Sequence, residues 1–290
     1  MALPAILQHL ALPVVGSPMF IVSYPELVLA QCKAGIVGSF PALNARPAGA
    51  LDEWLTQIQA ELAAHKAANP DAVIGPIAVN QIVHQSNARL EEDVHVCVDH
   101  KVPIFITSLR APVKEMIAVH AYGGIVLHDV INLRHAQKAL EAGVDGPIVL
   151  SGAIANGGSI LAAQAMGADL VYGHALYRDE RGACAGQLQT GDRRFERGGH
   201  YLHESVYGRA RELHSREHRE HGPRSGRAAR LRQNRHEFLR WHQQGESVEG
   251  LWGAGQGVGL MEDVPSVAEL VARLKREYDD AKSRLISPAA

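Results

Sequence analysis

The sequence of 290 residues is poor in features that would each indicate a particular class of protein. It has only three cysteines, Cys32, Cys97 and Cys184, at unrelated spacings, so it shows neither a disulfide framework nor a metal-binding motif. It has no apolar stretch of membrane-spanning length, and its first residues lack the basic start of a secretion signal. We therefore expect a cytoplasmic protein with no bound metal and no membrane partner.

A second absence is confined to residues 174–251. This tract contains 15 arginines but no lysine, isoleucine or methionine, together with 8 of the 16 histidines. Its 15 basic residues against 11 acidic ones give a net charge of +4, whereas the rest of the chain, with 14 against 20, has −6. The apolar periodicity of helices and strands is also missing there. A solvated, disordered basic segment would explain this composition.

A shifted reading frame explains the same tract more specifically. Read from the second base of ordinary codons, His174–Gly182 can encode TRFIATSE, His200–Gly222 can encode TIYTNLFTGVHGNYIRESIVNTG, and Arg235–Ser247 can encode GMNFFGGTSKAKA. The three strings are well formed and share one phase. We therefore interpret the tract as frameshifted, opening near Tyr172–Gly173 and closing near Leu251–Trp252, an interpretation that the nucleotide sequence would test.

The first 173 residues alternate β-branched runs with stretches rich in alanine and charge, a pattern typical of parallel βαβ units. The predicted strands are Pro13–Ser17, Gly35–Ser39, Gly75–Asn80, Ile104–Ser108, Gly124–His128, Pro147–Leu150 and Asp169–Tyr172. The predicted helices are Tyr24–Ala34, Leu51–Asn69, Asn87–His100, Ala111–Tyr122, Asn132–Ala142 and Gly158–Met166, with a closing amphipathic helix over Val264–Leu285. Strands that each lead into a crossover helix predict an α/β fold of the (β/α)8 TIM-barrel type.

One of the eight strands is missing. The helix over Asn132–Gly143 should lead into a strand beginning at Val144, but Gly146 runs directly into Pro147 with no room for that strand, its loop and its helix. An internal deletion would produce this junction, and a natural seven-strand variant or an open sheet is the alternative. The chain then divides into a barrel portion (residues 1–173), the irregular tract (174–251) and a C-terminal barrel-associated segment (252–290).

Six segments carry a family resemblance when they are taken together and in order. They are LPVVGSPMFIVS, AGIVGSFPALNAR, GPIAVNQIVHQSN, GGIVLHDVINLRHAQKALEAGVDG, PIVLSGAIANGGSILAAQAMGADLVYG and WGAGQGVG, within residues 10–173 and 252–278. The set resembles the nitronate monooxygenases, formerly called 2-nitropropane dioxygenases. The resemblance implies an FMN-dependent barrel enzyme that oxidises alkyl nitronates or nitroalkanes with O2.

The resemblance also implies which residues contact FMN. The flavin ring would lie against residues that end or follow the first, third and fifth strands: Pro18, Met19, Asn80, Gln81 and His128. His128 would stabilise a reduced, anionic flavin. The phosphate would lie against residues after the last two strands, where glycine lets the backbone approach closely: Ser151, Gly152, Ala153 and Gly173. Gln256 would be a late flavin contact. Without the resemblance, Met19 could equally be a core residue and Asn80 a turn former.

The catalytic residue of this chain is unknown from its sequence. The family's base is a histidine in a GGHAG-like loop, which falls in the gap between Gly146 and Pro147. A positioned base typically supplies about 10²–10⁴-fold, so we expect impaired nitroalkane oxidation, whereas a nitronate is already deprotonated. The alternatives are an inactive, damaged family member, or another flavin-barrel reductase acting on a quinone or an enoyl thioester.

Two patterns in the irregular tract are set aside. His214, His218 and His221 have the spacing of metal ligands on a helix, and the arginines up to Arg240 would attract nucleic acid. A shifted frame in GC-rich DNA enriches arginine and histidine without selecting for either site. We therefore expect a small-molecule substrate and no nucleic-acid partner, and the sequence does not indicate an oligomeric state.

Overall fold

The computed structural model describes residues 3–20, 22–47, 49–110, 113–152, 154–173, 263 and 265–286, with the side chains of residues 113–116 left out. All of these residues belong to one compact unit. The irregular tract, Ala153 and Gln256 lie outside the described residues. The predictions made for them therefore stay predictions.

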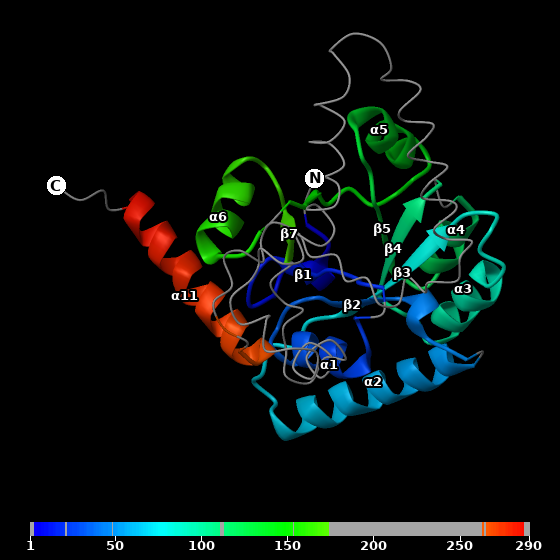
Figure 1. The fold of residues 1–290 in the computed structure, drawn as a ribbon, viewed down its shortest axis with the longest axis horizontal. Coiled ribbons are helices and arrows are strands. Elements are labelled where there is room, and N and C mark those ends of the chain that lie inside the picture. The colour runs from blue at the N-terminus through cyan, green and yellow to red at the C-terminus, as the bar shows by residue number, and fades with distance from the viewer. Residues whose placement is uncertain are drawn as a thin grey trace, which may run out of the picture. The chain divides into compact units, whose positions relative to one another are not determined.

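Seven parallel strands form the centre of the described fold (Figure 1). They are β1 (Val14–Gly16), β2 (Gly38–Pro41), β3 (Ile77–Val83), β4 (Ile104–Leu109), β5 (Ile125–His128), β6 (Val149–Leu150) and β7 (Leu170–Gly173). One sheet has the order β2-β3-β4-β5 and the other the order β1-β7-β6. A bridge between Val15 and Val37 joins them, so the described strands follow one another around a barrel, with none of them between β5 and β6.

A helix follows each strand up to β6, as the sequence predicts. These helices are α1 (Pro25–Lys33), α2 (Ala50–Ala68), α3 (Leu90–Asp99), α4 (Val113–His120), α5 (Leu133–Glu141) and α6 (Gly157–Ala165), with α11 (Val267–Ile286) near the C-terminus and short 3₁₀ turns at Ala5–Leu7 and Ala42–Asn44. The predicted strands and helices are thus confirmed. β3 is longer than predicted, because it pairs with β4 up to the Val83–Leu109 position. None of the described helices is long and apolar enough to cross a membrane.

The strands bury both faces, and alternate residues enter two different cores. The inner core lies inside the curved strands and includes Val15, Val37, Ala78, Ile104, Ile106, Ile125, Leu127 and Leu170. The outer core lies between the strands and the helices and includes Val79, Phe105, Val126, Leu55 and Ile58. Because side chains alternate along a strand, this assignment also decides which residues at the strand ends face inward.

The chain starts the missing strand and then leaves it. Asp145 donates its N–H to the carbonyl of Val126 at 3.0 Å, and its Oδ2 accepts from the N–H of Val126 at 2.7 Å. Asp169 makes the same two bonds with Ile148, both at 2.8 Å. β7 follows directly after Asp169, whereas Gly146 follows Asp145 and the chain turns away toward β6. The residues before the gap therefore dock on β5 as the start of a strand would.

The two segments are also alike in how their helices begin and end. Asn132 accepts a hydrogen bond from His135 N–H at the start of α5, and Asn156 accepts one from Ser159 N–H at the start of α6, both in the manner of N-caps. After each helix stands a glycine with positive φ, Gly143 at 95° and Gly167 at 100°, which ends the helix in the left-handed region. α5 is thus a complete βα-type element that lacks its following strand.

Apolar side chains are exposed beside the gap. Ile131, Leu133, Leu140 and Ile148 are 87%, 88%, 56% and 59% exposed. In a complete barrel, a strand and a helix would pack between β5 and β6 and cover such residues. The exposure agrees with the predicted loss of one strand-and-helix unit between Gly146 and Pro147.

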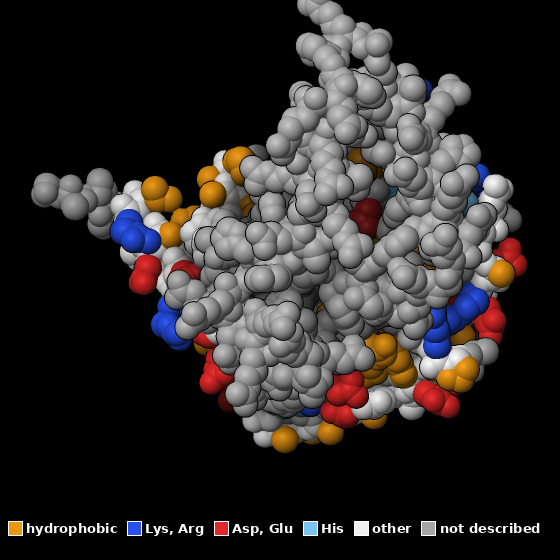
Figure 2. All heavy atoms as spheres, viewed as in Figure 1, with side chains coloured by type: hydrophobic (Ala, Val, Ile, Leu, Met, Phe, Trp, Pro, Cys, Tyr) orange, Lys and Arg blue, Asp and Glu red, His pale blue; other side chains and the backbone are white. Residues whose placement is uncertain are grey.

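The C-terminal helix α11 packs on α6, and α6 begins with a glycine at this contact (Figure 1). A Cβ at Gly157 would lie 2.2 Å from Tyr278 N and 2.3 Å from Leu274 O. Gly157 N–H donates to Glu277 Oε2 at 2.8 Å. Gly157 therefore allows α6 and α11 to pack closely. On its solvent side, α11 carries both acidic and basic side chains (Figure 2).

Candidate functional site

Polar side chains form a layer above the inner core at the carboxyl ends of the strands. Counting by twos from the inner-core residues of each strand leads to Ser17, Ser39, Asn80, Ser108, Asp129 and Tyr172. We call this set the mouth. In a parallel barrel this is the end where loops gather and where ligands bind, so the alternation of the strands builds a polar site on an apolar base.

Four of the mouth residues form one chain of hydrogen bonds across β3, β4, β5 and β7. Asn80 Nδ2 donates to Ser108 Oγ at 2.9 Å, and Ser108 Oγ donates to Asp129 Oδ2 at 2.7 Å. Tyr172 Oη donates to Asp129 Oδ1 at 3.2 Å. The two oxygens of Asp129 are thus held by residues from two different strands, and its side chain links the two sheets.

The orientation of the Asn80 amide is fixed by its partners. Nδ2 also donates to the carbonyl of Ile106 at 3.0 Å, and a carbonyl can only accept. Asn80 Oδ1 accepts no hydrogen bond from the residues that the structure describes. The mouth therefore has one amide oxygen to which no described residue donates, and the Ser17 hydroxyl, in a side chain that is 5% exposed, has no described partner either.

Tyr172 keeps its proton over a wide pH range. Burial raises the pKa of its hydroxyl well above the usual value of 10, and the nearby negative charge of Asp129 and the hydrogen bond to it raise the pKa further. A phenol that stays protonated is a permanent hydrogen-bond donor. It therefore holds Asp129 Oδ1 in place at all pH values where the carboxyl group is ionised.

The loop after β1 lies at the mouth, where the sequence predicted Pro18 and Met19 to contact a cofactor. Met19 N–H donates to Ser23 Oγ at 3.0 Å, and the Met19 carbonyl accepts from Asn44 Nδ2 at 2.9 Å. Asn44 Nδ2 also donates to the carbonyl of Ser23. Pro18 and Met19 are half-buried, so this loop has a fixed backbone and a partly accessible surface.

Gln81 and His128 are not brought into the mouth. Each stands one residue after an inward-facing position, so alternation turns it toward the helices. Gln81 is fully buried, and its Nε2 lies 3.5 Å from Cys97 Sγ on α3. His128 Nδ1 lies 2.9 Å from Thr107 Oγ1. The prediction that strand-end position alone would direct both side chains to a flavin neglected this alternation.

The surroundings of His128 favour its neutral form. Its pKa is lowered from 6.5, chiefly by burial, and His135 on α5 lowers it too, although Asp129 and the contact with Thr107 oppose the shift. The imidazole is therefore mostly neutral at pH 7. A positive charge beside a reduced flavin does not follow from this arrangement.

The predicted phosphate-binding residues lie at the ends of β6 and β7. Ser151 and Gly152 are exposed directly after β6, and Gly152 has φ +134° with no atom within 4 Å of the place of a Cβ. Gly173 is the last residue of β7 and pairs with Gly16 of β1. The described part of this region offers backbone with open space beside it.

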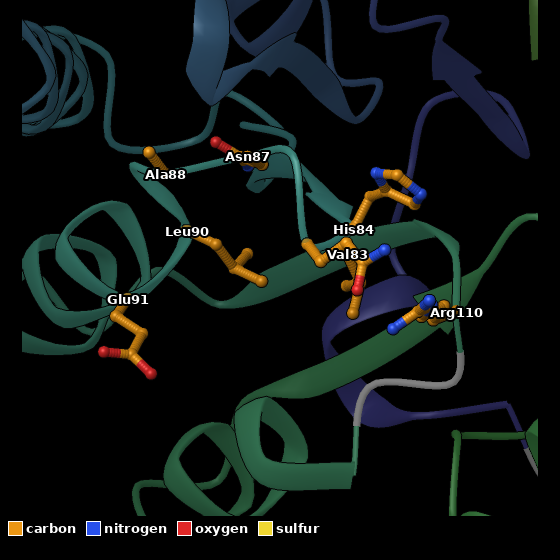
Figure 3. Close-up of a pocket in the computed structure, with 8 residues that line it drawn as sticks. Val83, His84, Asn87, Ala88, Leu90, Glu91 and Arg110 are labelled. Carbon is orange, nitrogen blue, oxygen red and sulfur yellow. The ribbon is translucent and has the colours of Figure 1, made fainter.

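A separate cleft of about 310 Å³ lies at the outer rim, between the ends of β3 and β4 and the start of α3 (Figure 3). Its polar lining includes His84, Asn87, Glu91 and Arg110. His84 Nδ1 accepts from Ser86 N–H at 3.2 Å. This cleft could not be predicted from the sequence, because most of its residues come from a loop without a regular pattern.

Ser108 and Tyr172 were not among the predicted site residues, and Asp129 was expected at the mouth beside His128 but was given no role. The signal that could have found them is the period of two: each stands two residues after a buried apolar residue of its strand, Ile106, Leu127 and Leu170. The predicted strands contained these core residues. Ser108 and Tyr172 are the last residues of their predicted strands and Asp129 directly follows its own, so carrying the period of two to the strand ends would have named all three.

Comparison with solved structures gives matches over nearly the whole chain, although no family model and no curated protein matches the sequence. FabK from Thermotoga maritima matches with a TM-score of 0.67 at 17% identity, over 97% of this chain and 96% of that chain. A nitroalkane oxidase from Streptomyces ansochromogenes matches with a TM-score of 0.62 at 19% identity, over 97% of this chain and 99% of that one. The fold is a TIM barrel. At these identities the likeness shows the architecture, and the described strands show that this barrel is incomplete between β5 and β6.

Proposed function

We propose that the mouth binds FMN and that the protein is a flavin-dependent oxidoreductase that oxidises alkyl nitronates with O2. The observation that carries the proposal is a pair of polar atoms at the mouth, Asn80 Oδ1 and Ser17 Oγ, that have no hydrogen-bond partner among the residues that the structure describes. The six family-like segments and the likeness in fold to a nitroalkane oxidase support the same assignment. We further propose a cytoplasmic location and a small-molecule substrate.

The residues present fit an isoalloxazine ring. Such a ring has an apolar body and a polar edge that both donates and accepts hydrogen bonds. Asn80 Oδ1 would accept from the ring's N–H, and the Ser17 hydroxyl would donate to a ring carbonyl. The partly accessible Pro18 and Met19 would lie against the ring, where a thioether makes favourable contacts with aromatic groups. Pairing the Ser17 hydroxyl would remove the cost of leaving it buried without a partner among the described residues.

The phosphate of the cofactor would lie by the backbone after β6 and β7. Gly152 leaves open space at its Cα, and Gly173 ends β7 beside β1. Backbone N–H groups at such positions bind phosphate oxygens closely because glycine has no side chain in the way. The predicted contacts of Ala153 and Gln256 belong to the same proposal.

FMN, when bound, would supply the redox chemistry of the nitronate and O2. The chain's own residues would orient the ring through Asn80 and the Met19 loop and hold the carboxylate of Asp129 at the mouth. No described residue occupies the place of the family's histidine loop, which the gap after Gly146 removes. A pre-formed nitronate is therefore the substrate that this chain is best suited to oxidise.

The test measures O2 consumption with FMN-reconstituted protein and a pre-formed nitronate. Turnover that disappears when FMN is removed and returns when it is added back would support the proposal. A monodisperse, folded protein that consumes no O2 under these conditions would refute the activity. A colourless, aggregated product would support the alternative of a damaged, inactive family member.

A second candidate is the reduction of a quinone or an enoyl thioester by a nicotinamide cofactor. It is favoured by the absence of the histidine loop, since a hydride transfer of this kind needs no base to deprotonate a carbon acid. Oxidation of NADH that depends on an added quinone or enoyl thioester, without O2 uptake in the presence of a nitronate, would identify this chemistry.

A further inference from the structure

Asp129 is the carboxylate that the described strand ends bring to the mouth. Its backbone N–H donates to the carbonyl of Thr107 at 2.8 Å, which extends the pairing of β4 and β5 by one residue. Its side chain is exposed, although Ser108 and Tyr172 each donate one hydrogen bond to it. The carboxylate is therefore both fixed in position and reachable from solvent.

Each oxygen of Asp129 can accept a further hydrogen bond. A carboxylate offers about four lone-pair sites, and Ser108 and Tyr172 use one on each oxygen. Both donors are neutral, so no cation lies among the side chains that bond to Asp129 in the described residues. His128, the titratable neighbour on the same strand, is turned toward the helices, and its lowered pKa keeps it mostly neutral. Asp129 thus has no neighbouring cation among the described side chains that bond to it, and it has lone pairs left at the mouth.

We propose that Asp129 is the catalytic base of this chain and takes the α-proton from a neutral nitroalkane, an inference that rests on the proposed function. The C–H bond breaks, its electron pair forms the carbon–nitrogen double bond, and a nitro oxygen takes up the displaced pair as the nitronate. The proton forms the carboxylic acid of Asp129 and returns to solvent. This step is a proton transfer and needs no oxidant.

Tyr172 and Ser108 are positioning residues in this scheme. They hold the two oxygens of Asp129 and so prevent the carboxylate from rotating away from the mouth. Asn80 acts one step further back, because its Nδ2 bonds to Ser108 Oγ and fixes the direction in which that hydroxyl donates. The same asparagine contacts FMN in the proposed function, so ring and base would share one hydrogen-bonded frame.

The experiment measures exchange of the α-hydrogen of nitroethane for deuterium in D2O, followed by proton NMR under anaerobic conditions with FMN present. The variants are Asp129→Asn and Asp129→Glu, and Asp99→Asn is the matched control because Asp99 is an exposed carboxylate on α3. We expect exchange above the buffer rate with wild type and the control, and a loss of about 10²-fold or more in Asp129→Asn. Asp129→Glu should keep a measurable part of the rate.

Two results would overturn the assignment of the base: exchange by wild type no faster than in buffer, or exchange by Asp129→Asn within threefold of wild type. Oxidation of a pre-formed nitronate separates this outcome from the proposed function. Wild type should oxidise the pre-formed nitronate whichever residue is the base, and circular dichroism compared with wild type shows whether Asp129→Asn is folded. If wild type neither binds FMN nor oxidises the nitronate, the proposed function fails, whereas the exchange result still decides whether Asp129 is a base.

Discussion

Replacing Asp145 by alanine tests whether the chain really begins a strand beside β5. The carboxylate accepts from the N–H of Val126 at 2.7 Å, and Val126 is 0% exposed. Alanine would leave this N–H without a partner and out of reach of water, which costs about 1–3 kcal/mol. The pair with His120 at 2.8 Å is partly exposed and adds little. We expect the free energy of unfolding to fall by about 2 kcal/mol.

Asp169 is the internal control, because it makes the same bond to the N–H of Ile148. Ile148 is 59% exposed, so water can replace the lost carboxylate. Asp169→Ala should therefore cost less than about 1 kcal/mol, and Asp145→Asn, which keeps an acceptor, should stay close to wild type. Urea unfolding gives the free energies, and hydrogen exchange of the Val126 amide should speed up about 30-fold in Asp145→Ala. Equal losses in the two alanine variants would refute the reasoning.

Three further predictions concern the helices and the outer core. Burial raises the pKa of Asp93, and its bonds to Arg89 oppose the shift, so Arg89→Ala should raise that pKa further. Because the pKa is raised in the folded state, the variant should keep its stability at acid pH and lose it as the pH rises. The loss, measured by unfolding at several pH values, should reach about 2 kcal/mol at neutral pH, less than for a fully buried pair. Gly157→Ala places a methyl group 2.2 Å from the backbone of α11 and should cost about 1–3 kcal/mol, whereas Gly158→Ala, whose nearest contact is 3.4 Å, should leave the thermal midpoint unchanged or slightly higher. Burial raises the pKa of Cys32 to about 12, so iodoacetamide at pH 8 should label it only after denaturation, and rapid labelling of the native protein, seen by peptide mass spectrometry, would contradict its place in the core.

The strands and helices were predictable because their periodicity is strong. β4 and β5 are runs of β-branched and apolar residues, and the caps Asn132 and Asn156 mark the helix starts. The missing strand was also predictable, because the spacing between α5 and β6 is too short for a βα unit. The pair of bonds that Asp145 makes with Val126 could not be foreseen, since it depends on where the chain lies after the deletion.

The site was predictable in place but not in its members. The sequence predicts a site at the carboxyl ends of the strands, and the structure places Asn80 and Met19 there. Gln81 and His128 do not face the mouth, because a side chain's face depends on its distance in residues from a buried neighbour and not on being last in the strand. Asp129 was recognisable as a strand-end residue, but only the fold shows that Tyr172 from β7 reaches it.

The most direct test is a titration of the folded protein with FMN, followed by the change in flavin absorbance and fluorescence, in wild type and in Asn80→Ala. We predict saturable binding by wild type and about tenfold weaker binding by the variant, which is the effect of losing one buried hydrogen bond of roughly 1.4 kcal/mol. A wild-type protein whose circular dichroism shows the α/β fold but which binds no FMN would contradict the assignment of the mouth as a flavin site.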